Sequence, residues 1–349
     1  MRRLPRLLSS TLLAAAVFPA LAAADVVPQP TVAPPVPAPA PAPMTIRTGF
    51  ENPGGAPVHA VIAGGKVRVV GAVRPYIAGQ TVFVRTLRRG MGLEAREVPV
   101  ASAGNGLGRF VALIGVGGRP ATVSVRVSHL PTALQVGLDP PALSLPVVRA
   151  TVAPGEQSAS ARLLQEELSG LHYAVPRSGR LDDATGRAVM AFRKLTDLAR
   201  TEQANRVVFE RLASGAGAFH VRDPGQGAHF EGDLTHQVLA EVLPGGRVRR
   251  IYEMSSGKPS TPTVIGRFSI YMKTLGTNEK GMVDANYFVG GYAIHGYFDV
   301  PPYPASHGCL RIPIPDAAAV YAWARFGYPV DVYYRTGGGS RQVRGNAGP

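Results

Sequence analysis

The chain has 349 residues, which is too long for one ordinary domain and long enough for two or three domains with separate cores. Its formal net charge of +14 favours attraction to polyanions. The positive charge comes mainly from scattered arginines, and aromatic residues make up only 7% of the chain, so we expect no nucleic-acid partner.

The first 24 residues have the order of parts of a signal peptide. Three arginines precede an apolar run, and small residues follow at Ala20, Ala22 and Ala24. The run is short for a membrane span and Pro19 interrupts it, so we expect cleavage near Asp25 rather than a retained anchor. The expected location is the periplasm, the cell wall or the medium. Membrane contact is then expected only through an uncleaved signal, and an anionic cell-wall polymer becomes a candidate partner.

Residues 25–43 alternate proline with alanine and valine. This composition favours an extended polyproline conformation and predicts a stiff linker.

Residues 44–150 contain short valine-rich runs separated by glycine, proline and asparagine. Within 121–128, valines alternate with polar residues, which is typical of a strand with one buried face. The runs predict strands at 66–73, 80–87, 109–116 and 121–128. We expect an immunoglobulin-like β-sandwich domain that acts as a spacer or protein-contact module.

Residues 157–214 change to helical spacing. Leucines recur at three- and four-residue intervals near 164–171, and Asp182 and Asp183 provide a capping signal before a second helix. A third short helix is expected near 208–212. The order of helix, "GRLDDATGRAV" loop and helix resembles the small peptidoglycan-binding domains of wall enzymes; a plain helical spacer bundle is the alternative.

Residues 218–335 return to strands, with one helix expected at 317–326, capped by Asp316 and ended by Gly327. The fold class is therefore multidomain and mainly β: a sandwich-like domain, a three-helix bundle and a mostly β C-terminal domain. Residues 336–349 form a glycine-rich tail that we expect to be disordered.

Cys309 is the only cysteine and cannot form a disulfide within its own chain. A thiol attacks a carbonyl well only as a thiolate, and a neighbouring imidazole is the usual means of producing one. His295 and His307 are both candidates. Gly296 and Gly308 allow the backbone to approach closely, and amides near Cys309 could face a developing oxyanion.

The "AIHG…SHGCLR" pattern, with the upstream "SSGKPSTPTVIGRFSIY" and "GMVDANYFVGGYAIHG", resembles the YkuD-type L,D-transpeptidase domain of bacterial cell-wall enzymes. This resemblance implies that Cys309 is the nucleophile, His295 the general base and the Gly296 carbonyl its orienting partner. It also implies roles for residues around them. The oxyanion pocket would use Ser306, His307 and Gly308, and the substrate-binding groove Tyr287, Thr261, Thr263 and Arg311.

The implied reaction transfers a peptidoglycan stem peptide through a thioester, with release of D-Ala, to an amine of another stem. If water resolves the thioester, the same site is an L,D-carboxypeptidase.

Two other interpretations remain at the level of sequence. His295, His307 and Cys309 could be three zinc ligands, although the spacing is unusual and no carboxylate cluster supports it. The chain could instead be a non-catalytic wall-binding scaffold. We expect no metal and no cofactor.

Overall fold

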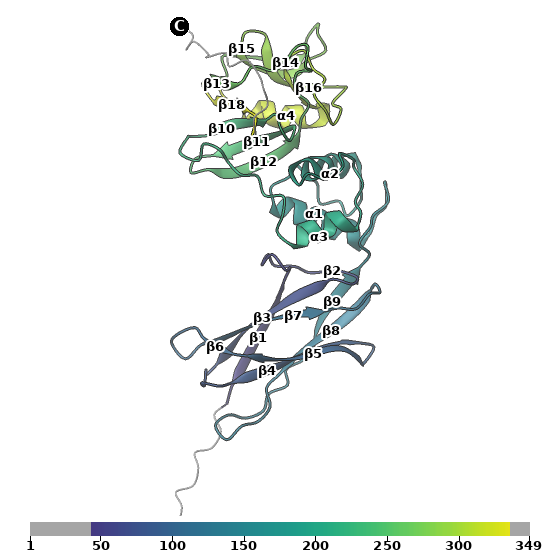
Figure 1. Ribbon diagram of the computed structural model, residues 1–349, viewed down its shortest axis with the longest axis vertical. Coiled ribbons are helices and arrows are strands. Elements are labelled where there is room, and N and C mark those ends of the chain that lie inside the picture. Colours follow the sequence, from purple (N-terminus) through teal and green to yellow (C-terminus); the bar gives the residue numbers. More distant parts are fainter. Residues whose placement is uncertain (1–42, 336–349) are drawn as a thin grey trace, which may run out of the picture. The chain divides into compact units, whose positions relative to one another are not determined.

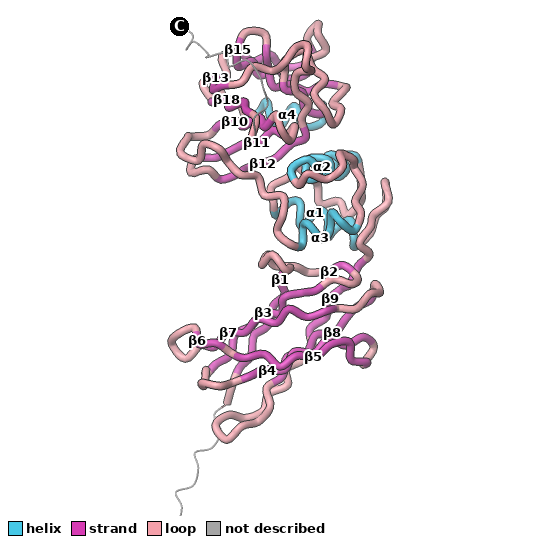
Figure 2. The backbone as a smooth tube through the Cα atoms, in the orientation of Figure 1, coloured by secondary structure: helices cyan, strands magenta, loops and turns pink. Residues whose placement is uncertain are grey.

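The computed structural model describes residues 43–335 (Figure 1). The predicted signal peptide, almost all of the 25–43 linker and the 336–349 tail lie outside the described residues. In the described part, every helix is too short or too polar to cross a membrane. The mainly β, multidomain fold class predicted from the sequence is confirmed, with helices confined to a middle segment and one C-terminal element (Figure 2).

The N-terminal β domain consists of a four-stranded and a five-stranded sheet that share one valine-rich core. The first sheet has the order β1-β3-β7-β6 and the second β2-β9-β8-β4-β5. Their strands are β1 Thr45–Glu51, β2 Val61–Ile62, β3 Lys66–Arg74, β4 Thr81–Arg88, β5 Met91–Pro99, β6 Ala101–Ser102, β7 Gly108–Gly115, β8 Ala121–Ser128 and β9 Leu143–Val148.

The four strands predicted from valine content are confirmed within one residue at each end as β3, β4, β7 and β8. In β8 the alternation holds for Val123 and Val125, which are buried between the sheets. It fails at Ser128, which is also buried and whose hydroxyl accepts a hydrogen bond from Arg85 at 3.3 Å. A polar residue at the end of a strand can therefore be buried on the other face when a partner satisfies its hydrogen bond.

The helical module contains α1 Ala159–Gly170, α2 Asp183–Leu195 and α3 Arg206–Ala213. Each begins after a residue whose side chain accepts a backbone N–H: Ser158, Asp182 and Asn205, respectively. The Asp182 cap was predicted from the sequence and is confirmed, whereas Asp183 is the first residue inside α2. The Asn205 cap was not predicted.

The C-terminal module has two sheets, ordered β12-β11-β10-β18-β13 and β14-β15-β16-β17. A single apolar core contains residues from both sheets and from the helix α4. Its elements are β10 His229–Asp233, β11 Val238–Leu243, β12 Arg247–Glu253, β13 Gly266–Ser269, β14 Met272–Thr277, β15 Val283–Val289, β16 Tyr292–Tyr297, β17 Leu310–Pro313, α4 Ile314–Trp323 and β18 Pro329–Tyr333.

The predicted bounds and cap of the last helix were wrong. The helix α4 spans Ile314–Trp323 and starts directly after β17 at Pro313, whose φ of −57° suits a residue that precedes a helix. Asp316 lies within the first turn and bonds to Arg187 of α2 at 3.2 Å instead of capping the helix. The chain leaves the helix at Ala324, so Gly327 is not its end signal.

The helical module does not have a core of its own. Buried residues of α1, α2 and α3 belong to the same apolar cluster as Val238, Ala240 and Val242 of β11 and Ile251 of β12. Because burial of apolar surface is the main favourable term in folding, these two sequence segments stabilise each other.

The cap of α2 gives a test of this architecture. Asp182 accepts hydrogen bonds from the backbone N–H and the hydroxyl of Thr185 at 2.8 and 2.6 Å. We expect Asp182→Ala to lower the free energy of unfolding by about 1 kcal/mol, measured by urea denaturation. Asp183→Ala is the control, since Asp183 provides only a dipole interaction in the first turn. An equal loss in both variants would contradict the assigned cap.

Candidate active site

Parallel pairing of β16 with β17 fixes the relative positions of the predicted catalytic residues. Ile294 pairs with Leu310, and His295 pairs with Arg311. Ile294 and Leu310 are fully buried in the main apolar core. Because side chains alternate between the faces of a sheet, His295 lies on the opposite face, and so does Cys309, the residue directly before β17, which packs against Ala293 of β16.

The His295 imidazole is buried and oriented by its own neighbour. Its Nδ1 lies 2.8 Å from the carbonyl oxygen of Gly296. A carbonyl only accepts hydrogen bonds, so Nδ1 carries the proton and Nε2 presents its lone pair. Burial lowers the pKa of His295 to about 4. The ring is therefore neutral near pH 7.

The Cys309 thiol is the partly exposed member of the pair. Its sulfur lies 3.8 Å from the carbonyl oxygen of Gly291. Burial raises the pKa of the thiol, while a backbone hydrogen bond from Ala293 and the positive charges of Arg311 and Lys280 act in the opposite direction. The resting site thus holds a neutral thiol and a neutral imidazole, rather than a preformed ion pair.

Ser306 closes the tight turn that presents Cys309. Its hydroxyl donates to the carbonyl of Cys309 at 2.6 Å and accepts from the N–H of Gly308 at 3.0 Å. The Gly308 amide, predicted to face an oxyanion, is thus already bonded in this state. His307 is exposed, and its Nε2 lies 3.3 Å from Nζ of Lys258.

Gly308 occupies a position that only glycine fits. Its φ is +117°, and a Cβ there would lie 1.8 Å from Cε1 of Tyr292. The Tyr292 ring therefore packs directly against the backbone just before the thiol.

The predicted substrate-binding threonines and tyrosine are all engaged in local hydrogen bonds. Thr261 donates to the carbonyl of Ser306 at 3.1 Å, and Thr263 accepts from the N–H of Gly257 at 2.8 Å. The hydroxyl of Tyr287 accepts from Asn278 at 3.1 Å. The two threonines hold the segment 257–263 beside the turn that contains Ser306.

Arg311 faces the loop that follows β16. Its guanidinium lies 4.0 Å from the ring centroid of Tyr297. It also donates to the Asp299 carbonyl at 3.4 Å and lies 3.7 Å from the Asp299 carboxylate. These contacts tie Arg311 to the loop after β16, whereas the sequence analysis expected it in the substrate-binding groove.

Two residues that support the site were missed as functional residues at the level of sequence. The carbonyl of Ser256 accepts the N–H groups of Ala305 and Ser306 at 2.8 and 2.9 Å, and Ser255 exchanges two backbone bonds with Arg311 at 2.9 Å each. Both residues lie in the "SSGK" segment, but these contacts use backbone groups, whose partners the side-chain sequence does not reveal.

Among residues 43–335, no three His, Cys, Asp or Glu side chains are grouped as metal ligands, so the zinc interpretation finds no ligand set there.

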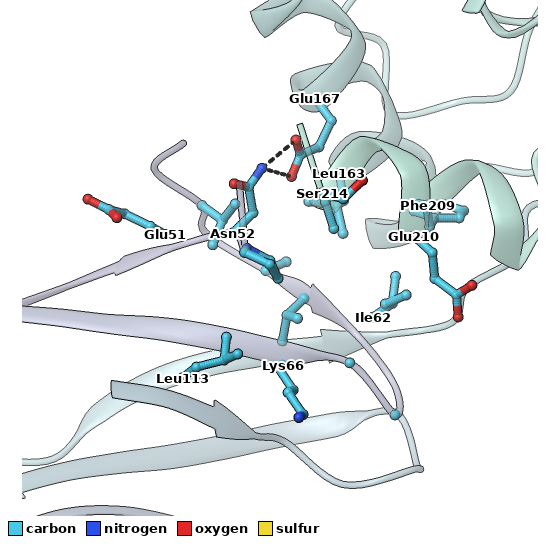
Figure 3. A pocket seen from close by; sticks show the side chains of 17 residues that line it. Glu51, Asn52, Ile62, Lys66, Leu113, Leu163, Glu167, Phe209, Glu210 and Ser214 are labelled. Atoms are coloured by element: carbon cyan, nitrogen blue, oxygen red, sulfur yellow. Dashed lines mark hydrogen bonds between the residues drawn. The ribbon is translucent and has the colours of Figure 1, made fainter. Parts of the chain in front are cut away.

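The cavity drawn in Figure 3 is lined by residues of the β domain and the helical module, where Asn52 donates to Glu167 at 3.0 and 3.3 Å. It includes none of the predicted catalytic residues.

Comparison with known proteins defines the class of the C-terminal domain. Residues 228–332 match the YkuD family model, the L,D-transpeptidase catalytic domain. The chain therefore contains an L,D-transpeptidase catalytic domain in this segment. No curated protein matched the chain.

Solved L,D-transpeptidase structures are similar to parts of the chain. The one from Xylanimonas cellulosilytica is 31% identical, covers 54% of this chain and 100% of its own, and gives a TM-score of 0.49. The one from Stackebrandtia nassauensis is 19% identical, with coverages of 53% and 95% and a TM-score of 0.35. A cysteine-to-serine mutant from Enterococcus faecium is 26% identical, with coverages of 31% and 50% and a TM-score of 0.28.

The neutral thiol predicts a specific pH dependence. Alkylation of Cys309 by iodoacetamide should be slow at neutral pH and should accelerate only above the range in which an ordinary thiol, with a pKa of about 8.5, ionises. The rate is measured from pH 5 to 10 with unfolded protein as the control. Fast alkylation already at pH 6 would mean a preformed thiolate.

The packing at Gly308 predicts a local defect on substitution. Gly308→Ala should lower the free energy of unfolding by about 1–3 kcal/mol, because the new side chain meets Tyr292 and the backbone conformation is strained. Chemical denaturation measures this loss. Gly225→Ala is the matched control, since a Cβ there would meet nothing within 4 Å. Equal stability of the two variants would refute the close contact.

Proposed function

We propose that this protein is a cysteine-dependent L,D-transpeptidase that cross-links or remodels peptidoglycan stem peptides. The observation that carries the proposal is the placement of Cys309 and His295 on one face of paired strands, with Nε2 of His295 unprotonated. The matched family model supplies the substrate class.

In the first half-reaction, Sγ of Cys309 attacks the carbonyl carbon of the third stem residue while His295 Nε2 takes the thiol proton. The C–S bond forms as the amide C–N bond breaks, and the terminal D-Ala leaves with the proton from His295. In the second half-reaction, a stem amine attacks the thioester. His295 takes the amine proton and returns it to the departing thiolate.

The negative charge that forms on the Cys309 sulfur in this reaction lies near two positively charged side chains. Arg311 and Lys280 both favour negative charge at Cys309. They lower the energy of the thiolate as His295 removes the proton. We propose that the Cys309 amide donates to the oxyanion, with Ser306 and His307 shaping its pocket.

The resting neutral pair fits this scheme. Proton transfer is coupled to attack, so the thiol becomes nucleophilic only when a substrate carbonyl is present. The chemistry needs no cofactor and no metal.

We also propose that the chain works outside the cytoplasm, in the periplasm or the cell wall. The support is the signal-like order of residues 1–24 and the need for an enzyme to meet peptidoglycan. An anionic wall polymer is the further partner that the charge of +14 favours.

Peptidoglycan binding by the helical module is a separate proposal. A cleft beside the start of α2 is lined by Arg180, Asp182, Asp183 and Glu202, among others. Their carboxylate and guanidinium groups are suited to bonds with sugar hydroxyls. Glycan pull-down with the intact chain tests this separately from catalysis.

The main test is mass spectrometry of products formed from disaccharide-tetrapeptide stems by the chain from Asp25 onward and by its Cys309→Ala variant. We expect cross-linked dimers that have lost D-Ala, and none from the variant. Tripeptide alone would change the assignment to L,D-carboxypeptidase. Unchanged stems, with a working positive-control enzyme, would favour the wall-binding scaffold.

A further inference from the structure

Lys194 places a charged group from the helical module inside the C-terminal module. The residue is only 1% exposed. Its Nζ donates to the carbonyls of Met254 and Gln237 at 3.0 and 3.3 Å and to the carboxylate of Glu253 at 3.3 Å. Burial lowers the pKa of Lys194 to about 8, against the opposing charge of Glu253. Burying an ammonium group is costly, and a helix that served only as a spacer would not need to do so.

One of the residues that accept from Lys194, Gln237, is in turn bonded to the segment that holds the Cys309 turn. Gln237 holds Ser256 through two side-chain bonds, because its amide donates to the Ser256 hydroxyl and accepts the Ser256 N–H, both at 2.8 Å. The Ser256 carbonyl in turn accepts from Ala305 and Ser306. Ser306 then bonds to the carbonyl of Cys309. Hydrogen bonds, together with the covalent links within Gln237, Ser256 and Ser306, therefore connect Lys194 of α2 with the backbone of Cys309.

Arg200, which follows α2, bonds directly to the loop of residues 299–306 that precedes the Cys309 turn. Its Nη1 donates to the carbonyl of Pro302 at 2.7 Å, and its Nη2 donates to the carbonyl of Thr235 at 3.0 Å. Pro302 lies between His295 and Cys309 in the chain. The guanidinium thus connects the catalytic loop to the turn before β11.

The composition of that loop explains why it needs such donors. Residues 300–304 read "VPPYP", and the three prolines have no backbone N–H. The loop can therefore be held mainly through its carbonyl groups. Side chains supply the donors: Arg311 bonds to Asp299, Arg200 to Pro302, and Ser255 to Tyr303 at 2.7 Å.

We propose that Arg200 and Lys194 are positioning residues that hold residues 299–306, and with them the Cys309 turn, in the geometry needed for attack. The helical module is then part of the catalytic unit as well as a candidate wall-binding module. The effect on turnover rests on the proposed function, whereas the effect on the loop does not.

The test compares Arg200→Ala with wild type and with Arg211→Ala, which removes an exposed arginine from the last turn of α3. The first readout is amide hydrogen exchange of residues 298–306, observed by mass spectrometry of the intact chain after labelling. We expect exchange to be about tenfold faster in Arg200→Ala and unchanged in Arg211→Ala, because a charged donor to a carbonyl is lost.

The second readout is turnover of stem-peptide donors. We expect kcat to fall about tenfold in Arg200→Ala while KM changes less than about twofold, because the residue orients the nucleophile and does not contact the donor. Arg200→Lys should recover only part of the loss, since a lysine does not reproduce the two-pronged guanidinium. Lys194→Met should give the same two effects through the Ser256 path.

The outcomes separate the two proposals. If wild type does not turn over stems but loop exchange rises in Arg200→Ala, the proposed function fails and the positioning role stands. Unchanged exchange and unchanged kcat in a folded Arg200→Ala variant would overturn the positioning role. Should Lys194→Met fail to fold, Arg200→Ala decides, because Arg200 is only half-buried.

Discussion

Parallel pairing of β16 with β17 is the constraint on which the geometry of the candidate active site depends. The backbone hydrogen bonds between the strands, rather than any contact between the two side chains, place His295 and Cys309 on one face. A shift of one residue in this register would turn one of them into the apolar core. Ile294 and Leu310 oppose such a shift, because both are fully buried in that core. The apolar packing on the other face of the sheet thus fixes the placement of His295 and Cys309.

Burial on the catalytic face determines the protonation states. Water exclusion disfavours both the imidazolium and the thiolate, so the pair is stored in its uncharged form. For a protein expected to work outside the cytoplasm, this form has a second effect. A neutral thiol reacts slowly with oxidants, since the thiolate is the reactive species. The same desolvation that delays ionisation therefore protects the only cysteine in the chain.

Sequence patterns identified the regular elements well where local chemistry determines them. Alternating valines gave β8, and the aspartate before the second helix gave the Asp182 cap. The last helix was misplaced because Asp316, a good capping residue in isolation, forms an ion pair with Arg187. The motif around Cys309 and His295 located the candidate site. The contacts of Ser255, Ser256 and Arg200 with that site were not predictable, since they involve backbone carbonyls far away in sequence.

The apolar cluster shared by the helices with β11 and β12 has a consequence for how the protein can be divided. The matched family segment starts at residue 228, after the last residue of α3. A fragment that begins there would expose Val238, Ala240 and Val242 to water and leave the Glu253 carboxylate without its lysine. Such a fragment would be prone to aggregate although it contains every candidate catalytic side chain. The smallest soluble form of the protein is therefore set by the limits of this hydrophobic core, which begins well upstream of the matched family segment.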